Sequence, residues 1–124
     1  AQISVGGTLP GLPIIARRGR KATLRTTVRN ASTRPFPAQA SYGRRLVRLG
    51  AQLCDANGVV VNRDYERAWL PQTLEPGDTA SIQMAITPPE TPGRYALKFD
   101  LVSEGIDWFE ACGSPTTVKT LLVI

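Results

Sequence analysis

Three carboxylates lie close together in the sequence, and they are the side chains best placed for acid–base chemistry. Glu104, Asp107 and Glu110 fall within one short stretch, and paired carboxylates can donate and accept a proton in hydrolytic reactions. The same stretch should lie beside the start of a strand that carries three arginines, among them Arg45. Because these cations can neutralise the carboxylates, we favour ion pairs over a catalytic site.

Other catalytic groups are missing from the composition. The chain has no histidine and only two cysteines, which excludes Ser-His and Cys-His nucleophilic sites and most zinc sites. No glycine-rich phosphate loop follows a strand and opens a helix. We therefore expect a protein that is not an enzyme and that needs no cofactor and no metal.

The aromatic pair Trp108-Phe109 offers a different chemistry in the same loop. Flat rings stack on the C–H faces of sugars or anchor protein interfaces, while flanking charged groups hydrogen-bond hydroxyls. The candidate ligand-binding residues are Trp108, Phe109, Asp107, Glu104 and Arg45. The alternative, which carries more weight for these two rings and for Trp69, is that the rings plug the ends of the fold.

Two strands of strictly alternating character position this loop. Ala80, Ile82, Met84 and Ile86 share one face of the first strand, and the second runs over residues 94–101 with its apolar side chains at every other position. Pro-Gly pairs mark the corners, because proline presets its backbone angle and glycine supplies a positive one.

Further strands are indicated along the rest of the chain. They are expected near the N-terminus at a sheet edge, and over residues 21–30, 45–55, 59–61, 67–71 and 118–124, with a hairpin turn at 55–58 and a long loop at 33–43. No helix is convincing. Regular short strands with turn signals predict an all-β, immunoglobulin-like antiparallel β-sandwich of seven to nine strands in two sheets.

The length of the chain and its terminal residues indicate how the protein is divided into domains. A chain of 124 residues suits a single sandwich domain over residues 1–124. It begins without methionine and ends in an apolar run, so we expect a segment excised from a longer chain or one that has lost a leader. No stretch approaches the ~20 apolar residues of a membrane span.

The basic residues are unevenly distributed. Residues 1–50 hold ten Arg or Lys and no acid, while residues 51–124 hold five bases and all ten acids. A basic surface for nucleic acid or anionic lipid is one interpretation. We favour a solvated, partly paired surface and expect no nucleic-acid partner, because strands from both halves interleave in a sandwich.

The two cysteines test this topology. Cys54 should lie at the far end of the sheet from Cys112, beyond the ~7 Å Cα separation that a disulfide tolerates. A bridge remains the less favoured alternative. Two free thiols fit a reducing compartment, and we expect a cytoplasmic location.

Several segments resemble one group of bacterial domains. They are Val28-Arg29-Asn30, the strand and turn over 49–58, Leu70-Pro71, Leu74-Glu75-Pro76-Gly77-Asp78, Pro88 with Pro92-Gly93-Arg94-Tyr95, and the stretch 100–109 with Gly113-Ser114. Together they resemble the immunoglobulin-like accessory domains of bacterial glycosyltransferases, methyltransferases and polysaccharide-export ABC transporter ATPases.

The resemblance implies a non-catalytic accessory domain of a bacterial cell-surface polysaccharide synthesis or export protein. It implies carbohydrate binding, with a polysaccharide or glycan and the catalytic or ATPase domain of the same chain as partners. The alternative is a structural or protein-interaction module that docks a catalytic domain or forms a homodimer through a sheet edge. Exposure of Trp108 and Phe109 separates the two, since a glycan needs open rings.

Overall fold

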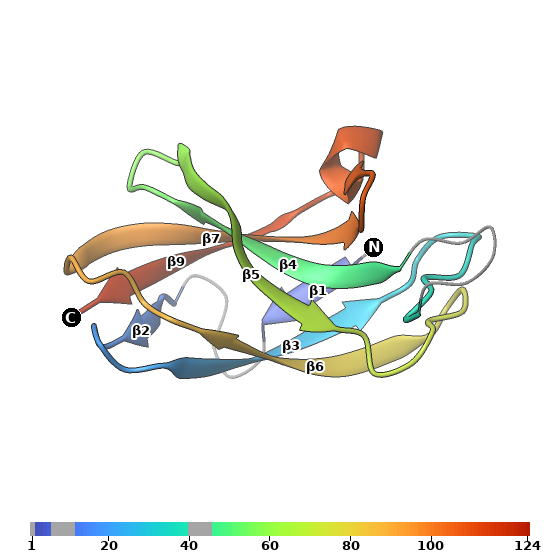
Figure 1. Ribbon diagram of the computed structural model, residues 1–124, viewed down its shortest axis with the longest axis horizontal. Helices are drawn as coiled ribbons and strands as arrows, with labels where there is room; N and C mark the ends of the chain where they lie inside the picture. Colours follow the sequence, from blue (N-terminus) through green and yellow to red (C-terminus); the bar gives the residue numbers. More distant parts are fainter. Residues whose placement is uncertain (1, 6–11, 40–45) are drawn as a thin grey trace.

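Two β-sheets pack face to face in the computed structural model, which describes residues 2–5, 12–39 and 46–124 (Figure 1). The strands are β1 (Gln2–Val5), β2 (Ile14–Ala16), β3 (Ala22–Arg29), β4 (Val47–Cys54), β5 (Val60–Trp69), β6 (Thr79–Ile86), β7 (Gly93–Ser103), β8 (Asp107–Trp108) and β9 (Thr117–Val123). None of the described helices is long and apolar enough to cross a membrane.

Sheet A is the three-stranded sheet, in the order β1-β3-β6, and sheet B has the order β2-β9-β7-β4-β5 with β8 attached to β7. This confirms the predicted immunoglobulin-like sandwich, with nine strands in the described part of the chain. One pairing departs from the antiparallel prediction. The chain crosses from sheet A to sheet B after β1, and β2 then runs parallel to β9, with Ile14 opposite Leu121.

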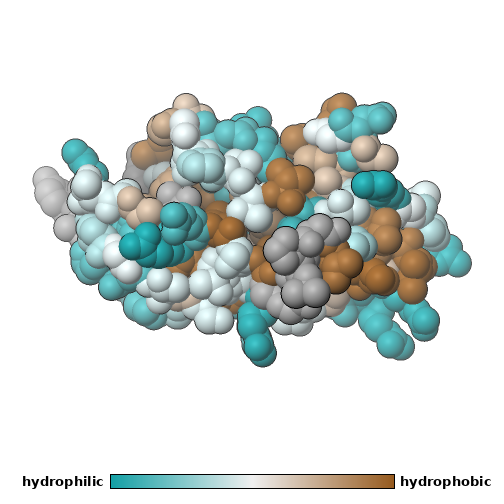
Figure 2. Space-filling model, turned by 180° about the vertical axis from the view of Figure 1, so that it is seen from behind, coloured by the Kyte–Doolittle hydropathy of each residue, from teal (hydrophilic) through white to brown (hydrophobic). Residues whose placement is uncertain are grey.

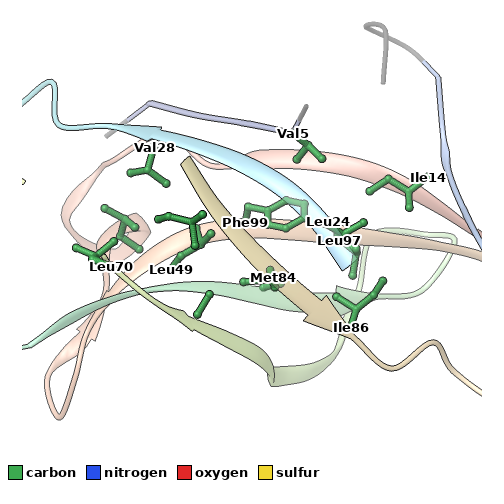
Figure 3. Packing of buried hydrophobic residues seen from close by; sticks show 14 of the residues in the cluster. Val5, Ile14, Leu24, Val28, Leu49, Leu70, Met84, Ile86, Leu97 and Phe99 are labelled. Carbon is green, nitrogen blue, oxygen red and sulfur yellow. The ribbon is translucent and has the colours of Figure 1, made fainter. Parts of the chain in front are cut away.

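The core lies between the sheets and follows the predicted alternation (Figure 3). In β6, Ala80, Ile82, Met84 and Ile86 are buried while the residues between them are exposed. Burying these side chains stabilises the fold by about 25 cal/mol for each Å² of apolar surface removed from water. The long-range pairing of β3 with β6 joins residues that are 50 to 64 positions apart in the sequence, from Arg29 with Thr79 to Ala22 with Ile86.

The outer face of β4 differs from the prediction. Alternation over residues 45–55 predicts that Gly50, Gln52 and Cys54 face solvent, but all three are buried. The segment that follows β7 folds back over this face, since β8 pairs with β7 and Trp108 packs on Gly50. Gly50, Gln52 and Cys54 therefore lie in a second, smaller buried region on the outer side of sheet B.

Strand β9 shows the opposite arrangement. Alternation predicts that Val118, Thr120, Leu122 and Ile124 share one face, and they do. This is the outer face, where Val118 and Ile124 are exposed. The buried residues of β9 are Leu121 and Val123. Apolar character alone could not tell the two faces of this strand apart, because both are apolar.

The return from the first hairpin is longer than predicted. Residues 59–61 and 67–71 were expected to form separate strands, whereas β5 runs unbroken from Val60 to Trp69. Its pairing with β4 shifts register near Leu53, so the polar residues between the two apolar segments are accommodated by bulges at an edge strand.

A short 3-10 helix, Phe109–Cys112, follows β8 and ends at Gly113, whose φ is 86°. The sequence analysis expected no helix, because four residues are too few to show helical periodicity. The predicted loop over 33–43 holds one bridge, between Phe36 and Leu74; its residues 40–43 lie outside the described part.

Candidate functional site

Trp108 does not lie in an open groove. Its side chain is only 6% exposed, and a Cβ placed on Gly50 would lie 2.6 Å from its Cη2 and Cζ3 atoms. The ring thus fills the space above the glycine and seals the outer face of β4. This burial favours the plugging role left open by the sequence, and ligand binding by Trp108 stays a prediction.

The guanidinium of Arg67 stacks on the ring of Trp108. The guanidinium carbon lies 4.5 Å from the ring centroid, a cation–π contact. Two carboxylates hold the guanidinium in place, with Arg67 Nε donating to Glu104 Oε1 at 3.3 Å and Arg67 Nη2 donating to Asp64 Oδ1 at 2.7 Å. The sequence analysis missed Arg67, although it pairs opposite Gly50 in the hairpin register.

Glu104 also organises a second aromatic contact. The same Oε1 atom accepts a hydrogen bond from Arg48 Nε at 3.0 Å, and the Arg48 guanidinium carbon lies 4.6 Å from the ring centroid of Trp69. One carboxylate therefore fixes two arginines, each of which stacks on a tryptophan. We call the four stacked residues and Glu104 the Trp-Arg ladder: Trp69, Arg48, Glu104, Arg67 and Trp108.

Trp69 is the open end of this ladder. It is 62% exposed, at the last position of β5 and opposite Arg48 in the strand register. The sequence analysis favoured a plugging role for this residue, and that prediction is wrong. Alternation along the strand was the available signal, because Ala68 faces the core and its neighbour must then face outward.

A cavity adjoins Trp69. Its volume is about 750 Å³, and its lining includes prolines, amides and a hydroxyl. The lining residues are Pro37, Ala38, Gln39, Trp69, Leu70, Pro71, Gln72 and Thr73. An indole wall next to side-chain amides combines an apolar platform with hydrogen-bonding groups, the mixture that small polar ligands require.

Asp107 joins Glu104 and Trp108 in the lining of a hollow of about 420 Å³, together with Arg63 and Arg67, whereas Phe109 does not line it. Phe109 is half-buried and packs edge-to-face on Phe36, with ring centroids 5.3 Å apart. Asp107 is exposed and lies 4.0 Å from Arg63. Arg45 lies outside the described residues.

The three carboxylates each meet a cation. Glu104 is paired with Arg48, Asp107 lies near Arg63, and Glu110 pairs with Lys98 at 2.6 Å. Ion pairs therefore form as expected, but only Glu104 meets one of the predicted arginines, since Asp107 and Glu110 have Arg63 and Lys98 as partners.

Asp100 is a buried acid below the 3-10 helix. It is 1% exposed, and burial raises its pKa, while hydrogen bonds from the N–H groups of Glu110 and Leu101 act in the opposite direction. These bonds anchor the helix on β7. The described residues include no group of three or more side chains that could hold a metal ion.

No family model matches the chain, and no curated protein matches its sequence. Among solved structures, the crystal structure of the CARDB domain of PF1109 from Pyrococcus furiosus, in complex with di-metal ions, is similar with a TM-score of 0.56 and 14% identity. The match covers 98% of this chain and 84% of that one. The solution NMR structure of the same domain has a TM-score of 0.54 and 13% identity, covering 98% and 90%. At this identity the likeness shows the sandwich fold alone.

Proposed function

We propose that the chain is a non-catalytic accessory domain that binds carbohydrate through Trp69 rather than through Trp108. The observation that carries the proposal is the exposure of Trp69, 62%, in a ring whose position is fixed by Arg48. An exposed aromatic held rigidly loses little conformational entropy when a ligand stacks on it.

The surroundings of Trp69 suit a sugar ring. Pyranose C–H groups can stack on the indole, and hydroxyls can bond to the amides of Gln39 and Gln72 in the adjoining cavity. Arg48 holds one face of the ring and is itself held by Glu104. Glu104 thus keeps a role in the proposed site, as a positioning residue.

The setting that we propose is a bacterial surface-polysaccharide synthesis or export protein, in the cytoplasm. The sequence resemblance supports the setting, and two free thiols, Cys54 and Cys112, fit a reducing compartment. The catalytic or ATPase domain of the same chain is then the neighbour to which the accessory domain presents its glycan.

Intrinsic fluorescence during titration with neutral bacterial surface polysaccharides tests the proposal. We expect a saturable change that Trp69→Ala abolishes, while Phe109→Leu leaves the apparent affinity within twofold. Both variants are first checked for native circular dichroism, since Trp69 is exposed and its loss should not unfold the domain. A saturable response that survives in Trp69→Ala would refute the site.

Protein docking is a second candidate, and a separate observation favours it. On the outer face of β9 and its neighbour β2, three apolar residues are exposed: Ile15 by 64%, Val118 by 58% and Ile124 by 60%. Brown atoms gather on the right of Figure 2, at the end of the molecule where the C-terminus lies. Contiguous exposed apolar residues mark interaction sites. Sedimentation velocity of the wild type and of Val118→Lys tests a homodimer, which should dissociate in the variant.

A further inference from the structure

The outer face of sheet A carries positive charge and no acid. Lys21, Arg25 and Arg29 lie on this face, because they alternate with the core residues of β3 and are exposed. None of β1, β3 and β6 contains Asp or Glu. Most other outward residues of these three strands carry a hydroxyl or an amide, and only Ala85 lacks one: Gln2, Ser4, Thr23, Thr27, Thr79, Ser81, Gln83 and Ala85.

The three cations form a straight row. They are spaced four residues apart along one strand, which places successive charges about 13 Å apart. At the Lys21 end, the turn between β2 and β3 adds three exposed arginines, Arg17, Arg18 and Arg20. We call these six residues together the cationic face. Figure 2 shows hydrophilic side chains projecting along the lower edge of the molecule, where sheet A lies.

The cationic face contrasts with sheet B. On the outer side of sheet B, Arg48, Arg63, Arg67 and Lys98 each lie within 4.0 Å of a carboxylate. Within the described residues, none of the six cations of the cationic face forms such an ion pair. Of these four cations only Arg48 belongs to the basic first half, so within the described residues the predicted neutralisation between the two halves is limited to the pair of Arg48 with Glu104.

Within the described residues, the acid that precedes β6 forms no ion pair with the row. Asp78 precedes β6 at the Arg29 end, and its carboxylate accepts a hydrogen bond from the N–H of Glu75 at 3.0 Å. Arg29 instead donates to Gln2 at 3.4 Å. Like charges along the row repel one another, so an external anionic surface would relieve this repulsion.

The shape of the face indicates which anion fits. The outward positions of β3 and β6 carry no aromatic ring, so single-stranded nucleic acid would find no side chain on which to stack its bases. The exposed side chains between the cations are small, as in Thr23 and Ser81, and leave a sheet surface without large projecting groups. A planar array of negative charge can approach all three strands at once.

We propose that the cationic face docks on an anionic phospholipid bilayer. Lys21, Arg25 and Arg29 would face the headgroups, and the arginine turn would extend the contact. Each basic residue near an anionic leaflet strengthens binding by roughly fivefold, and the attraction decays within a Debye length. This site lies on the opposite sheet from Trp69 and does not rest on the proposed carbohydrate function.

Co-sedimentation with vesicles tests the proposal on the chain as it stands. The probes are vesicles of phosphatidylcholine alone and of phosphatidylcholine with 30% phosphatidylserine, at low and at physiological salt. The test variant is Arg25→Gln/Arg29→Gln. The control is Arg63→Gln/Arg94→Gln, which removes the same charge from two exposed cations of sheet B.

We expect binding to the anionic vesicles alone, weakened by salt, and a loss of at least tenfold in Arg25→Gln/Arg29→Gln. The control should lose less than threefold. Equal losses in the two double variants would show attraction by net charge and overturn the proposal. Absence of binding at low salt, or tighter binding of an oligothymidine or of polygalacturonate than of vesicles, would also overturn it.

Discussion

The indole of Trp108 occupies the space that a side chain at Gly50 would fill. A Cβ on Gly50 would lie 2.6 Å from two carbons of the ring, and 3.3 Å from Nη1 of Arg67. Real Cβ atoms do not approach carbon so closely, so the glycine is required by the ring above it. This one contact joins β4, β5 and β8 into the covered side of sheet B.

Gly50→Ala should therefore destabilise the domain by about 1–3 kcal/mol, the usual cost of overpacking an interior. Urea denaturation measures the change. The reason is displacement of Trp108, whose emission should shift toward longer wavelength as the ring becomes wetter. Ser81→Ala, at an exposed position of β6, is the control and should change stability by less than about 0.5 kcal/mol.

A double-mutant cycle isolates the contact. In the Trp108→Ala background the space above Gly50 is vacant, so Gly50→Ala should then cost little. Equal costs in both backgrounds would show that the alanine acts through the backbone of β4 and not through the ring.

Glu104→Gln should loosen both stacked arginines. Its Oε1 accepts from Arg48 and Arg67, and the side chain is about one quarter exposed, so we expect a loss of about 1 kcal/mol. The dynamic quenching of Trp69 by acrylamide should rise, because Arg48 no longer holds one face of the ring. Glu90→Gln, an exposed acid in the loop before β7, should change neither quantity.

The fold could be predicted from the sequence because strands and turns leave local sequence patterns. Strict alternation in β6 and the Asp55 to Gly58 turn fix two elements, and in the turn Asp55 Oδ1 accepts from the N–H groups of Asn57 and Val59. Asn30 likewise ends β3 in a turn, as expected, with Nδ2 donating to the carbonyls of Arg34 and Leu74.

The candidate site was harder to predict from the sequence, because it depends on which part of the outer face of sheet B is covered by another segment. Trp108 and Trp69 have the same residue type, yet one is buried and the other is exposed. The difference arises from the return of the segment after β7 over Gly50, a long-range contact that periodicity does not encode. The glycine in the middle of β4 was the one local hint.

The two thiols should react differently. Both are free, with Cys112 exposed and Cys54 buried, and burial raises the pKa of the Cys54 thiol. One thiol per chain should react at once with an aromatic disulfide reagent in the native state, and two after unfolding. Cys112→Ser should remove the fast reaction, and Cys54→Ser should keep it.

The same reaction also tests the absence of a disulfide. The predicted free state of both thiols is confirmed. If the native protein shows no reactive thiol before reduction, the thiols are paired and this assignment is wrong.

Tyr65 should make stability fall at alkaline pH. Burial raises its pKa to about 12 from 10.0, and its hydroxyl donates to the carbonyl of Thr87, linking β5 to the end of β6. Below pH 10 the phenol is protonated in the folded and the unfolded state. As the pH rises from about 10 to about 12, the unfolded state releases its proton first, so the free energy of unfolding decreases.

Urea denaturation at pH 8 and pH 11 tests this link, with Tyr65→Phe and Tyr95→Phe as a matched pair. Tyr95 also donates its hydroxyl to a carbonyl, that of Thr91 at 2.7 Å, so each variant loses one such bond. We expect the decrease between the two pH values to shrink in Tyr65→Phe alone. The ultraviolet titration of Tyr65→Phe should also lack the phase near pH 12, and its persistence would assign that phase to another tyrosine.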